Sequence, residues 1–266
     1  MKIAYLLSGH ARVYQHTSHL LEKRLLKTLK KKSQVDVFIS TWKMTDRGGC
    51  PEWKTSPEAE LRKYYPSLAR VEIELNWSYT NRYVSDFYKR WKVWSLMVEE
   101  EQRTGEAYDI VFRDRMDSCH VREFPAEELD DLGDKVHFPI FVGDYKFRPF
   151  VDWIAFGTRD AMFDYFNIFN LIKDASYEDN VAGLINEKLS NYYPEQVLYA
   201  GLKSRERETK FSSYEIQPYD RYFGVKVHDI EVHSDDKGEF RLTTRRYGGV
   251  VPDVPERENY DKPEDL

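Results

Sequence analysis

The chain has 266 residues, a formal net charge of −6 and 15% aromatic residues. This length can bury a hydrophobic core without disulfides, and 41% hydrophobic with 32% charged residues is typical of a globular protein. The negative net charge argues against a nucleic-acid partner, which would require a basic surface. Two cysteines without metal-ligand spacing predict neither a disulfide framework nor a zinc site.

Membrane and secretion signals are absent from the sequence pattern. No apolar run approaches the roughly 18 residues of a membrane-spanning helix, and the apolar run at residues 3–7 is too short for a secretion signal. We therefore expect a cytoplasmic protein without a transmembrane segment. If its substrate is lipid-linked, we expect only peripheral contact with the membrane.

The first 40 residues carry the pattern of a strand, a helix and a second strand. Residues 3–7 are apolar and end at a small polar turn, which predicts a buried strand. In residues 17–32, leucines recur at helical spacing on one face, with Lys and Arg opposite. Residues 35–40 are again typical of a strand. A strand–helix–strand unit of this length predicts a parallel sheet.

The next segment mixes turn residues with one long helix. Residues 43–69 contain a Gly pair and three prolines, and we expect them to be irregular. Residues 70–75 alternate in polarity and predict a strand. Residues 80–104 predict a helix, capped by Thr80 and ended by Gly105. We interpret the aromatic stripe on that helix as core rather than as a ligand platform.

The remaining elements are shorter. Strands are expected at residues 108–112, 136–140 and 152–157, followed by a helix capped by Thr158 and a later helix opening at Pro194. The alternation of strands and helices predicts an α/β/α sandwich around a mainly parallel, Rossmann-type sheet.

The domain organisation is expected to be simple. Neither an internal repeat nor a linker is evident, so we expect one domain over residues 1–266. Its core should span about 1–205, with a C-terminal extension at 206–266. The last 20 residues are rich in Pro, Glu, Asp and Arg and predict a loose tail.

Charged residues follow the strand at 108–112 directly: Arg113, Asp114, Arg115 and Asp117. Ligand sites of parallel α/β sheets lie beyond the carboxyl ends of strands, where these side chains would be delivered. Carboxylate oxygens bind Mg²⁺ or Mn²⁺, and arginine holds phosphate in a bidentate manner. The alternative is a surface turn whose charges pair with one another.

The turn after the first strand is a second candidate, with the sequence Ser8-Gly9-His10-Ala11-Arg12. A small turn next to a helix N-terminus is suited to a phosphate or nucleotide. It matches neither the Gly-rich dinucleotide fingerprint nor the P-loop. His10 and Arg12 are equally consistent with ordinary loop residues.

Two more carboxylates are candidate general bases. Asp152 begins an apolar strand, where a carboxylate can take a proton from an acceptor hydroxyl or make an ordinary turn hydrogen bond. Glu195 follows Pro194 in a first helical turn, where the helix dipole alone explains a carboxylate. The seven histidines show no metal-ligand spacing, and no nucleophilic serine motif is present.

The order of these segments resembles that of a known family. In chain order the segments are KIAYLLSGHAR (2–12), VDVFISTW (35–42), YDIVFRDRMD (108–117), DWIAFGT (152–158) and YPEQVL (193–198). Together they resemble the GT-A-fold glycosyltransferases of bacterial lipopolysaccharide and capsule synthesis and of glycan synthesis in large viruses. The resemblance covers about residues 1–205, and it is carried by the order of the segments rather than by one motif.

The resemblance implies transfer of a hexose or pentose from a nucleotide-diphosphate sugar, expected to be UDP-linked, to a hydroxyl of a growing glycan or polysaccharide. It also implies assistance by Mn²⁺ or Mg²⁺. The family's DxD-type metal motif falls on Arg115-Met116-Asp117, where only the last residue is acidic. Asp117 is therefore the expected metal ligand and Asp114 its partial substitute, while Arg113 and Arg115 would neutralise phosphate charge.

The resemblance also places the other candidates. The nucleotide is expected against the turn residues Ser8, Gly9, His10 and Arg12. Asp152 falls on the acceptor side and would be the base of an inverting transfer, whereas a retaining transfer would need no such base. Glu195 matches a recurring Pro-Glu pair to which the resemblance gives no role, and we expect it only as a substitute for Asp152.

Two other functions stay open. A sugar nucleotidyltransferase would need a Gly-rich, basic loop near the N-terminus, which the turn at residues 8–12 matches poorly. A carbohydrate-binding or structural protein without catalysis would use the many aromatic residues instead.

Overall fold

The structure is a computed structural model, and it describes residues 1–11, 13–43, 57–75, 82–141, 153–173, 194–218, 230–234 and 240–244. An eight-stranded sheet has the order β3-β2-β1-β4-β7-β6-β8-β5. Its strands are β1 (Lys2–Ser8), β2 (Gln34–Trp42), β3 (Leu68–Glu74), β4 (Ile110–Asp114), β5 (Ser118–His120), β6 (Lys135–Phe141), β7 (Ala155–Thr158) and β8 (Glu208–Pro218). A separate antiparallel pair consists of β9 (Ile230–Ser234) and β10 (Phe240–Thr244).

The sheet is mainly parallel, as the strand–helix–strand pattern predicts. β3, β2, β1 and β4 are parallel neighbours, and β6 is parallel to β8. β7 runs antiparallel between β4 and β6, and β5 runs antiparallel along β8. The expected α/β fold class is therefore confirmed.

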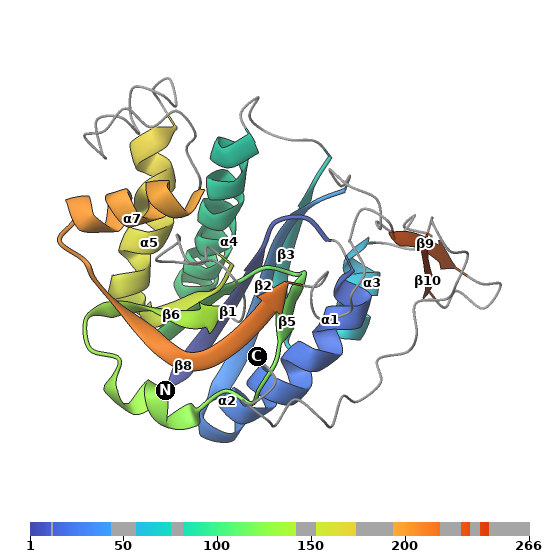
Figure 1. The fold of residues 1–266 in the computed structure, drawn as a ribbon, viewed down its shortest axis with the longest axis horizontal. Coiled ribbons are helices and arrows are strands. Elements are labelled where there is room, and N and C mark those ends of the chain that lie inside the picture. The colour runs from blue at the N-terminus through green and yellow to red at the C-terminus, as the bar shows by residue number, and fades with distance from the viewer. Residues whose placement is uncertain are drawn as a thin grey trace, which may run out of the picture.

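Helices cover both faces of the sheet (Figure 1). The helical elements are α1 (Tyr14–Leu21), the π-helical turn η1 (Glu22–Leu26), α2 (Lys27–Lys32), α3 (Pro57–Tyr64), α4 (Arg82–Thr104), η2 (Ala126–Asp131), α5 (Arg159–Ile172) and α7 (Pro194–Ser204). α4, α5 and α7 pack on one face, while α1, α2, α3 and η2 pack on the other. Strand β1 shows the two faces most clearly, because Ala4 and Leu6 join the α4 side and Tyr5 and Leu7 join the α1 side.

The long helix and its neighbours follow their sequence patterns. Phe87 and Trp94 of the aromatic stripe on α4 are buried, and Trp91 packs beside them, so this stripe is core as expected. The Thr158 hydroxyl caps α5 by accepting a hydrogen bond from the backbone N–H of Ala161 at 3.4 Å.

The prediction that residues 43–69 are irregular is wrong for α3 and for the start of β3. Pro57 occupies the first position of α3, Glu58 lies in its first turn and Arg62 in its last, an arrangement that suits the helix dipole. These local signals outweigh the turn residues around them. Strands β5 and β8 were also not expected, and β8 carries the central sheet beyond residue 205.

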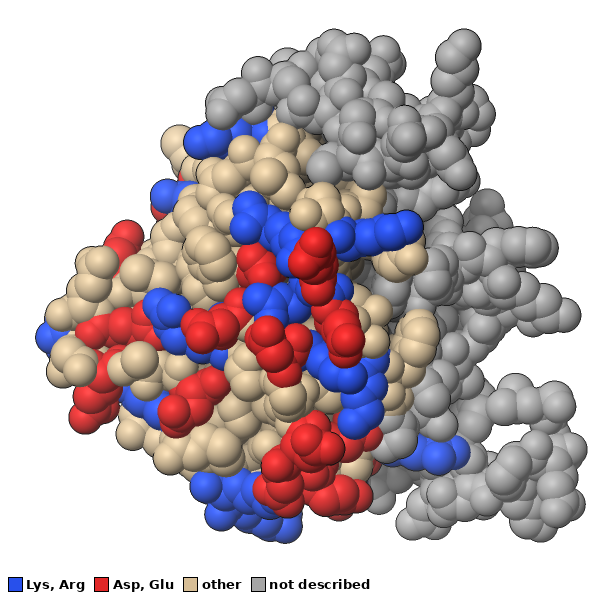
Figure 2. Space-filling view, turned by 90° about the vertical axis from the view of Figure 1, so that its left-hand side faces the viewer, with Lys and Arg blue, Asp and Glu red and all other residues tan. Residues whose placement is uncertain are grey.

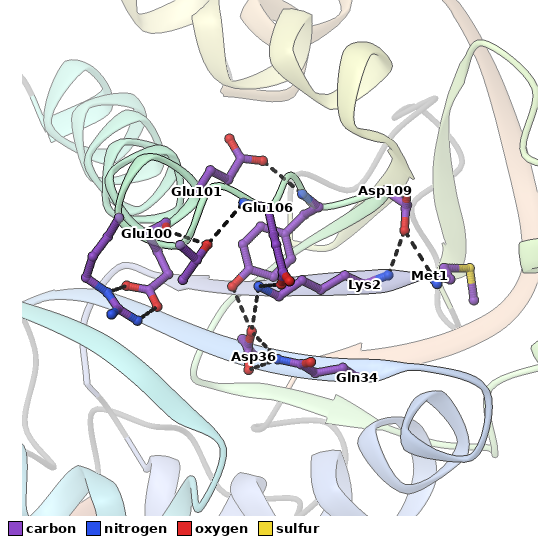
Figure 3. Close-up of polar contacts among 11 residues, drawn as sticks. Met1, Lys2, Gln34, Asp36, Glu100, Glu101, Glu106 and Asp109 are labelled. Carbon is purple, nitrogen blue, oxygen red and sulfur yellow. Dashed lines mark hydrogen bonds and ion pairs between the residues drawn. The ribbon is translucent and has the colours of Figure 1, made fainter.

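The amino ends of the parallel strands carry a network of charged and polar residues (Figure 3). Lys2 Nζ lies 3.8 Å from Asp36 and 3.4 Å from Glu106. The Tyr108 hydroxyl donates to Asp36 at 2.8 Å, and the backbone N–H of Lys2 donates to Asp109 at 2.7 Å. Because this network ties β1, β2 and the approach to β4 together with paired charges, we interpret it as structural.

Charge and hydropathy of the described surface agree with the composition. On the face drawn in Figure 2, acidic and basic side chains are interspersed, so that face presents no broad basic area. Within the part of the chain that the structure describes, no helix combines the length and apolar character needed to cross a bilayer.

Candidate functional site

The strand register brings the two main candidate motifs to one edge of the sheet. β1 ends at Ser8, which lies opposite Ser40 of β2, and Leu7 lies opposite Asp114 of β4. The turn that starts at Ser8 and the charged segment that starts at Arg113 therefore leave the sheet side by side. This is the carboxyl edge, where open α/β sheets bind ligands.

The turn after β1 begins with two small residues, Ser8 and Gly9, and is held by a backbone hydrogen bond. Ser8 is buried, and its hydroxyl has no hydrogen-bond partner among the described residues. Gly9 adopts φ 113°, a conformation that strains any residue with a side chain, and its N–H donates to the Ser40 carbonyl at 3.2 Å. The His10 ring lies 4.5 Å from the Trp42 ring, centroid to centroid. Arg12 lies outside the described residues.

Arg113 is fully buried at the carboxyl end of β4. It lies in register with Leu6 of β1 and Ala155 of β7, both of which face the α4 side of the sheet. Its Nη1 donates to the Trp153 carbonyl at 2.7 Å. A buried guanidinium held in this way is a preorganised positive charge.

Arg115 and Asp117 form a bidentate ion pair inside the turn that follows. Arg115 Nε and Nη2 donate to the two carboxylate oxygens of Asp117 at 2.8 and 2.7 Å. The Arg115 guanidinium also lies over the Trp153 ring, 4.1 Å from its centroid. Trp153 thus contacts both arginines, one through its carbonyl and one through its ring.

Two residues of α4, Asp86 and Arg90, lie near Arg113 and Arg115, and neither was identified from the sequence. Asp86 and the buried Arg90 form a close ion pair one helical turn apart. Burial raises the pKa of the Asp86 carboxyl, but the charges of Arg90, Arg113 and Arg115 outweigh it and hold that pKa below its ordinary value. The only sequence signal for these two residues is that an acidic and a basic side chain stand four positions apart on the helix, next to the aromatic stripe.

We call Arg90, Arg113 and Arg115, with Asp86 and Asp117, the arginine cluster. Three guanidinium groups thus gather at the carboxyl end of β4. Guanidinium groups at a strand end are suited to phosphate.

Lys89 places another buried cation near the same edge. Its ammonium lies 2.9 Å from Glu74 of β3 and 5.1 Å from the centroid of the Trp42 ring. Burial lowers the pKa of Lys89, while the hydrogen bond and charge of Glu74 oppose that shift.

Asp114 faces the opposite side of the sheet from Arg113. It is fully buried and accepts hydrogen bonds from the Tyr5 hydroxyl at 2.5 Å and from the backbone N–H of Arg115 at 2.7 Å. His120 Nε2 lies 3.0 Å from the same carboxylate. Asp114 is therefore part of the packing on the α1 side rather than of the arginine cluster.

Of the two predicted general bases, Glu195 is among the described residues and Asp152 is not. Glu195 is buried in the first turn of α7, on the same side of the sheet as α4 and Arg113. Asp152 lies outside the described residues, although the next residue, Trp153, contacts Arg113 and Arg115.

The described residues do not by themselves form a metal site. They contain no group of three or more His, Cys, Asp and Glu side chains placed to hold an ion. Both oxygens of Asp117 accept from Arg115, and Asp114 is held by Tyr5 and His120. Because Mg²⁺ commonly binds one or two carboxylates together with substrate phosphates, Asp117 fits only as a single protein ligand that a bound phosphate completes.

No protein-family model matches the chain. No curated protein is similar to it in sequence. One similar solved structure is a glycosyltransferase involved in glycosylation of the major capsid of PBCV-1, at 14% identity and a TM-score of 0.44, covering 80% of this chain and 82% of that one.

Two other similar structures are bacterial. A nucleoside-diphosphate-sugar pyrophosphorylase from Vibrio cholerae RC9 has 11% identity and a TM-score of 0.40, with coverage of 82% and 92%. A protein from Bacillus anthracis, assigned as a glucose-1-phosphate thymidylyltransferase and solved with a sucrose, has 9% identity and a TM-score of 0.43, with coverage of 82% and 89%. Similarities this low assign neither a family nor an activity to this chain.

Proposed function

We propose that the chain is a glycosyltransferase that moves a sugar from a nucleoside-diphosphate sugar, UDP-linked, to a hydroxyl of a glycan. The observation that carries this proposal is the arginine cluster at the carboxyl end of β4, beside the backbone turn at Ser8 and Gly9. The turn would take the nucleotide and the cluster its diphosphate.

The proposed chemistry follows from the charges. Breaking the bond between the sugar and the diphosphate leaves additional negative charge on the departing phosphate. Preorganised guanidinium groups stabilise charge that develops in this way, and they do so best in a site shielded from water. Arg113 is fully buried and Arg115 is held by Asp117 and Trp153, so both are positioned before a donor binds.

Three roles complete the proposal. Asp117 would hold Mn²⁺ or Mg²⁺, which would supply further positive charge at the diphosphate. Asp152 would deprotonate the acceptor hydroxyl in an inverting transfer, with Glu195, on the Arg113 side of the sheet, as its substitute.

The test is a turnover assay with UDP-sugars and glycan acceptors, with and without Mn²⁺, that measures both UDP and the glycosylated product. Acceptor-dependent UDP release with a matching product supports the proposal. Pyrophosphate release from UTP and a sugar 1-phosphate would replace it with a sugar nucleotidyltransferase. Glycan binding without nucleotide binding or turnover would replace it with a binding protein.

A further inference from the structure

The turn that presents Arg115 and Asp117 is closed at its two ends by side chains. Asp114 is the last residue of β4, and His120 is the last residue of β5. His120 Nε2 lies 3.0 Å from Asp114 Oδ2, and both side chains are only 1% exposed. This contact joins the strand before the turn to the strand after it.

The Asp114 carboxylate is contacted from three different places. The Tyr5 hydroxyl donates to it from β1 at 2.5 Å and the backbone N–H of Arg115 donates from the turn itself at 2.7 Å, while His120 Nε2 of β5 lies 3.0 Å away. A buried carboxylate without such donors would be strongly destabilising. With them, its position and that of the first residue of the turn are fixed.

His120 is held in turn by Tyr214 of β8. The two side chains approach to 2.6 Å between His120 Nδ1 and the Tyr214 hydroxyl. An imidazole whose proton is on Nε2 would accept the hydrogen of this hydroxyl at Nδ1. Burial and then the charge of Asp114 raise the pKa of Tyr214 well above its ordinary value, so its hydroxyl stays protonated and able to donate.

Helix α1 and the π-helical turn η1 hold the backbone of the same segment. The Thr17 hydroxyl donates to the Met116 carbonyl at 2.5 Å, and Arg24 Nη1 donates to the His120 carbonyl at 2.6 Å. The segment is therefore held through its backbone from the helices and through its side chains from the sheet.

We propose that Tyr5, Asp114, His120 and Tyr214 form a buried chain of polar contacts, the turn staple, that positions Arg115 and Asp117 for the donor diphosphate. The proposal rests on the proposed function. Its members are positioning residues, because they act on the donor only through the turn. Since Tyr214 belongs to β8, residues beyond 205 then contribute to the geometry of the site.

The experiment compares three staple variants with a matched control. His120→Leu removes the hydrogen bond to Tyr214 and the polar contact with Asp114, His120→Gln keeps a polar group that can reach Asp114, and Tyr214→Phe removes only one hydroxyl. The control is His137→Leu, because His137 lies on β6, outside the turn, and is equally buried and hydrogen-bonded, to the Leu132 carbonyl. Each variant is studied at a temperature at which circular dichroism shows it fully folded.

Two readouts are needed, hydrogen–deuterium exchange of residues 113–121 and the dissociation constant for UDP. We expect His120→Leu to speed exchange and weaken UDP binding about tenfold each, as the loss of a buried hydrogen bond would. His120→Gln should stay close to the wild type in both exchange rate and UDP affinity. Tyr214→Phe should change both in the same direction as His120→Leu, but less. If His120→Leu does not fold, Tyr214→Phe carries the test.

Equal effects of His120→Leu and His137→Leu on both readouts would overturn the proposal, as would unchanged exchange in Tyr214→Phe and His120→Leu. A wild-type chain that binds no nucleotide would instead overturn the proposed function. The two failures are distinguishable because exchange is measured without a ligand.

Discussion

Arg115 donates to both carboxylate oxygens of Asp117, at 2.8 and 2.7 Å, within the turn that leaves the carboxyl end of β4. The pair satisfies a buried carboxylate and competes with an ion for its two oxygens. A donor diphosphate would compete for Arg115, so binding of phosphate and release of Asp117 should be linked.

The first prediction concerns this carboxylate. Asp117→Ala is expected to lower UDP-sugar turnover by about a hundredfold or more, because it removes the proposed metal ligand and the partner of Arg115. The Mn²⁺ dependence of UDP binding should be lost in the same variant. Asp130→Ala is the control, since Asp130 forms an exposed ion pair with Lys32 far from the turn. Near-normal turnover would remove Asp117 from the mechanism.

The second prediction concerns guanidinium geometry. Arg113→Lys and Arg115→Lys keep the positive charge but lose the planar donor fork, so each is expected to weaken UDP binding about tenfold. Calorimetric titration with UDP measures the change. Arg62→Lys, in an exposed pair with Glu58, should bind like the wild type. Unchanged affinity in both cluster variants would show that the diphosphate does not bind there.

The third prediction separates backbone strain from site geometry. Gly9→Ala and Gly133→Ala both place a side chain at positive φ, 113° and 56° respectively. Each should lower the free energy of unfolding in urea by about 1–2 kcal/mol. Only Gly9→Ala should also weaken nucleotide binding, because Gly9 lies at the carboxyl edge and Gly133 precedes β6. Equal nucleotide affinity in the two variants would contradict the placement of the nucleotide.

The fourth prediction is a pH dependence of stability. Burial lowers the pKa of His137 below its ordinary value of 6.5, although the hydrogen bond to Leu132 opposes the shift. The unfolded chain therefore binds more protons than the folded one, so stability falls as pH drops below about 6.5 toward the folded-state pKa. His137→Gln should make this slope shallower in urea unfolding at pH 7, 6 and 5. The same slope in both proteins would contradict a buried neutral histidine.

Local sequence signals predicted the elements that depend on periodicity or caps. The run at residues 3–7, the leucine face that follows it and the Thr158 cap each correspond to an observed element. The prediction of irregular structure around α3 was wrong because the acidic first turn and the basic last turn of that helix stabilise it despite the nearby prolines.

The contacts within the site could not be predicted from the sequence, because they depend on the tertiary structure. The alternation of side chains along β4 already separates Asp114 from Arg113, since neighbouring residues of a strand face opposite sides. The groups around them come from distant positions: Asp86 from α4 lies near Arg113, Tyr5 from β1 donates to Asp114, and Tyr214 from β8 contacts His120 beside it. No local pattern indicates such contacts, because they depend on strand order and helix placement rather than on spacing.

The measurement that tests the central claim most directly is a thermal-shift panel of UDP, GDP, CMP and UDP-sugars, each with and without Mn²⁺. A ligand at about a hundred times its dissociation constant stabilises the folded state by roughly 2.7 kcal/mol, which for a chain of this size raises the Tm by several degrees. We expect this shift with UDP and UDP-sugars, larger with Mn²⁺, and none with CMP. A cooperatively unfolding sample that shows no shift with any nucleotide would contradict the account.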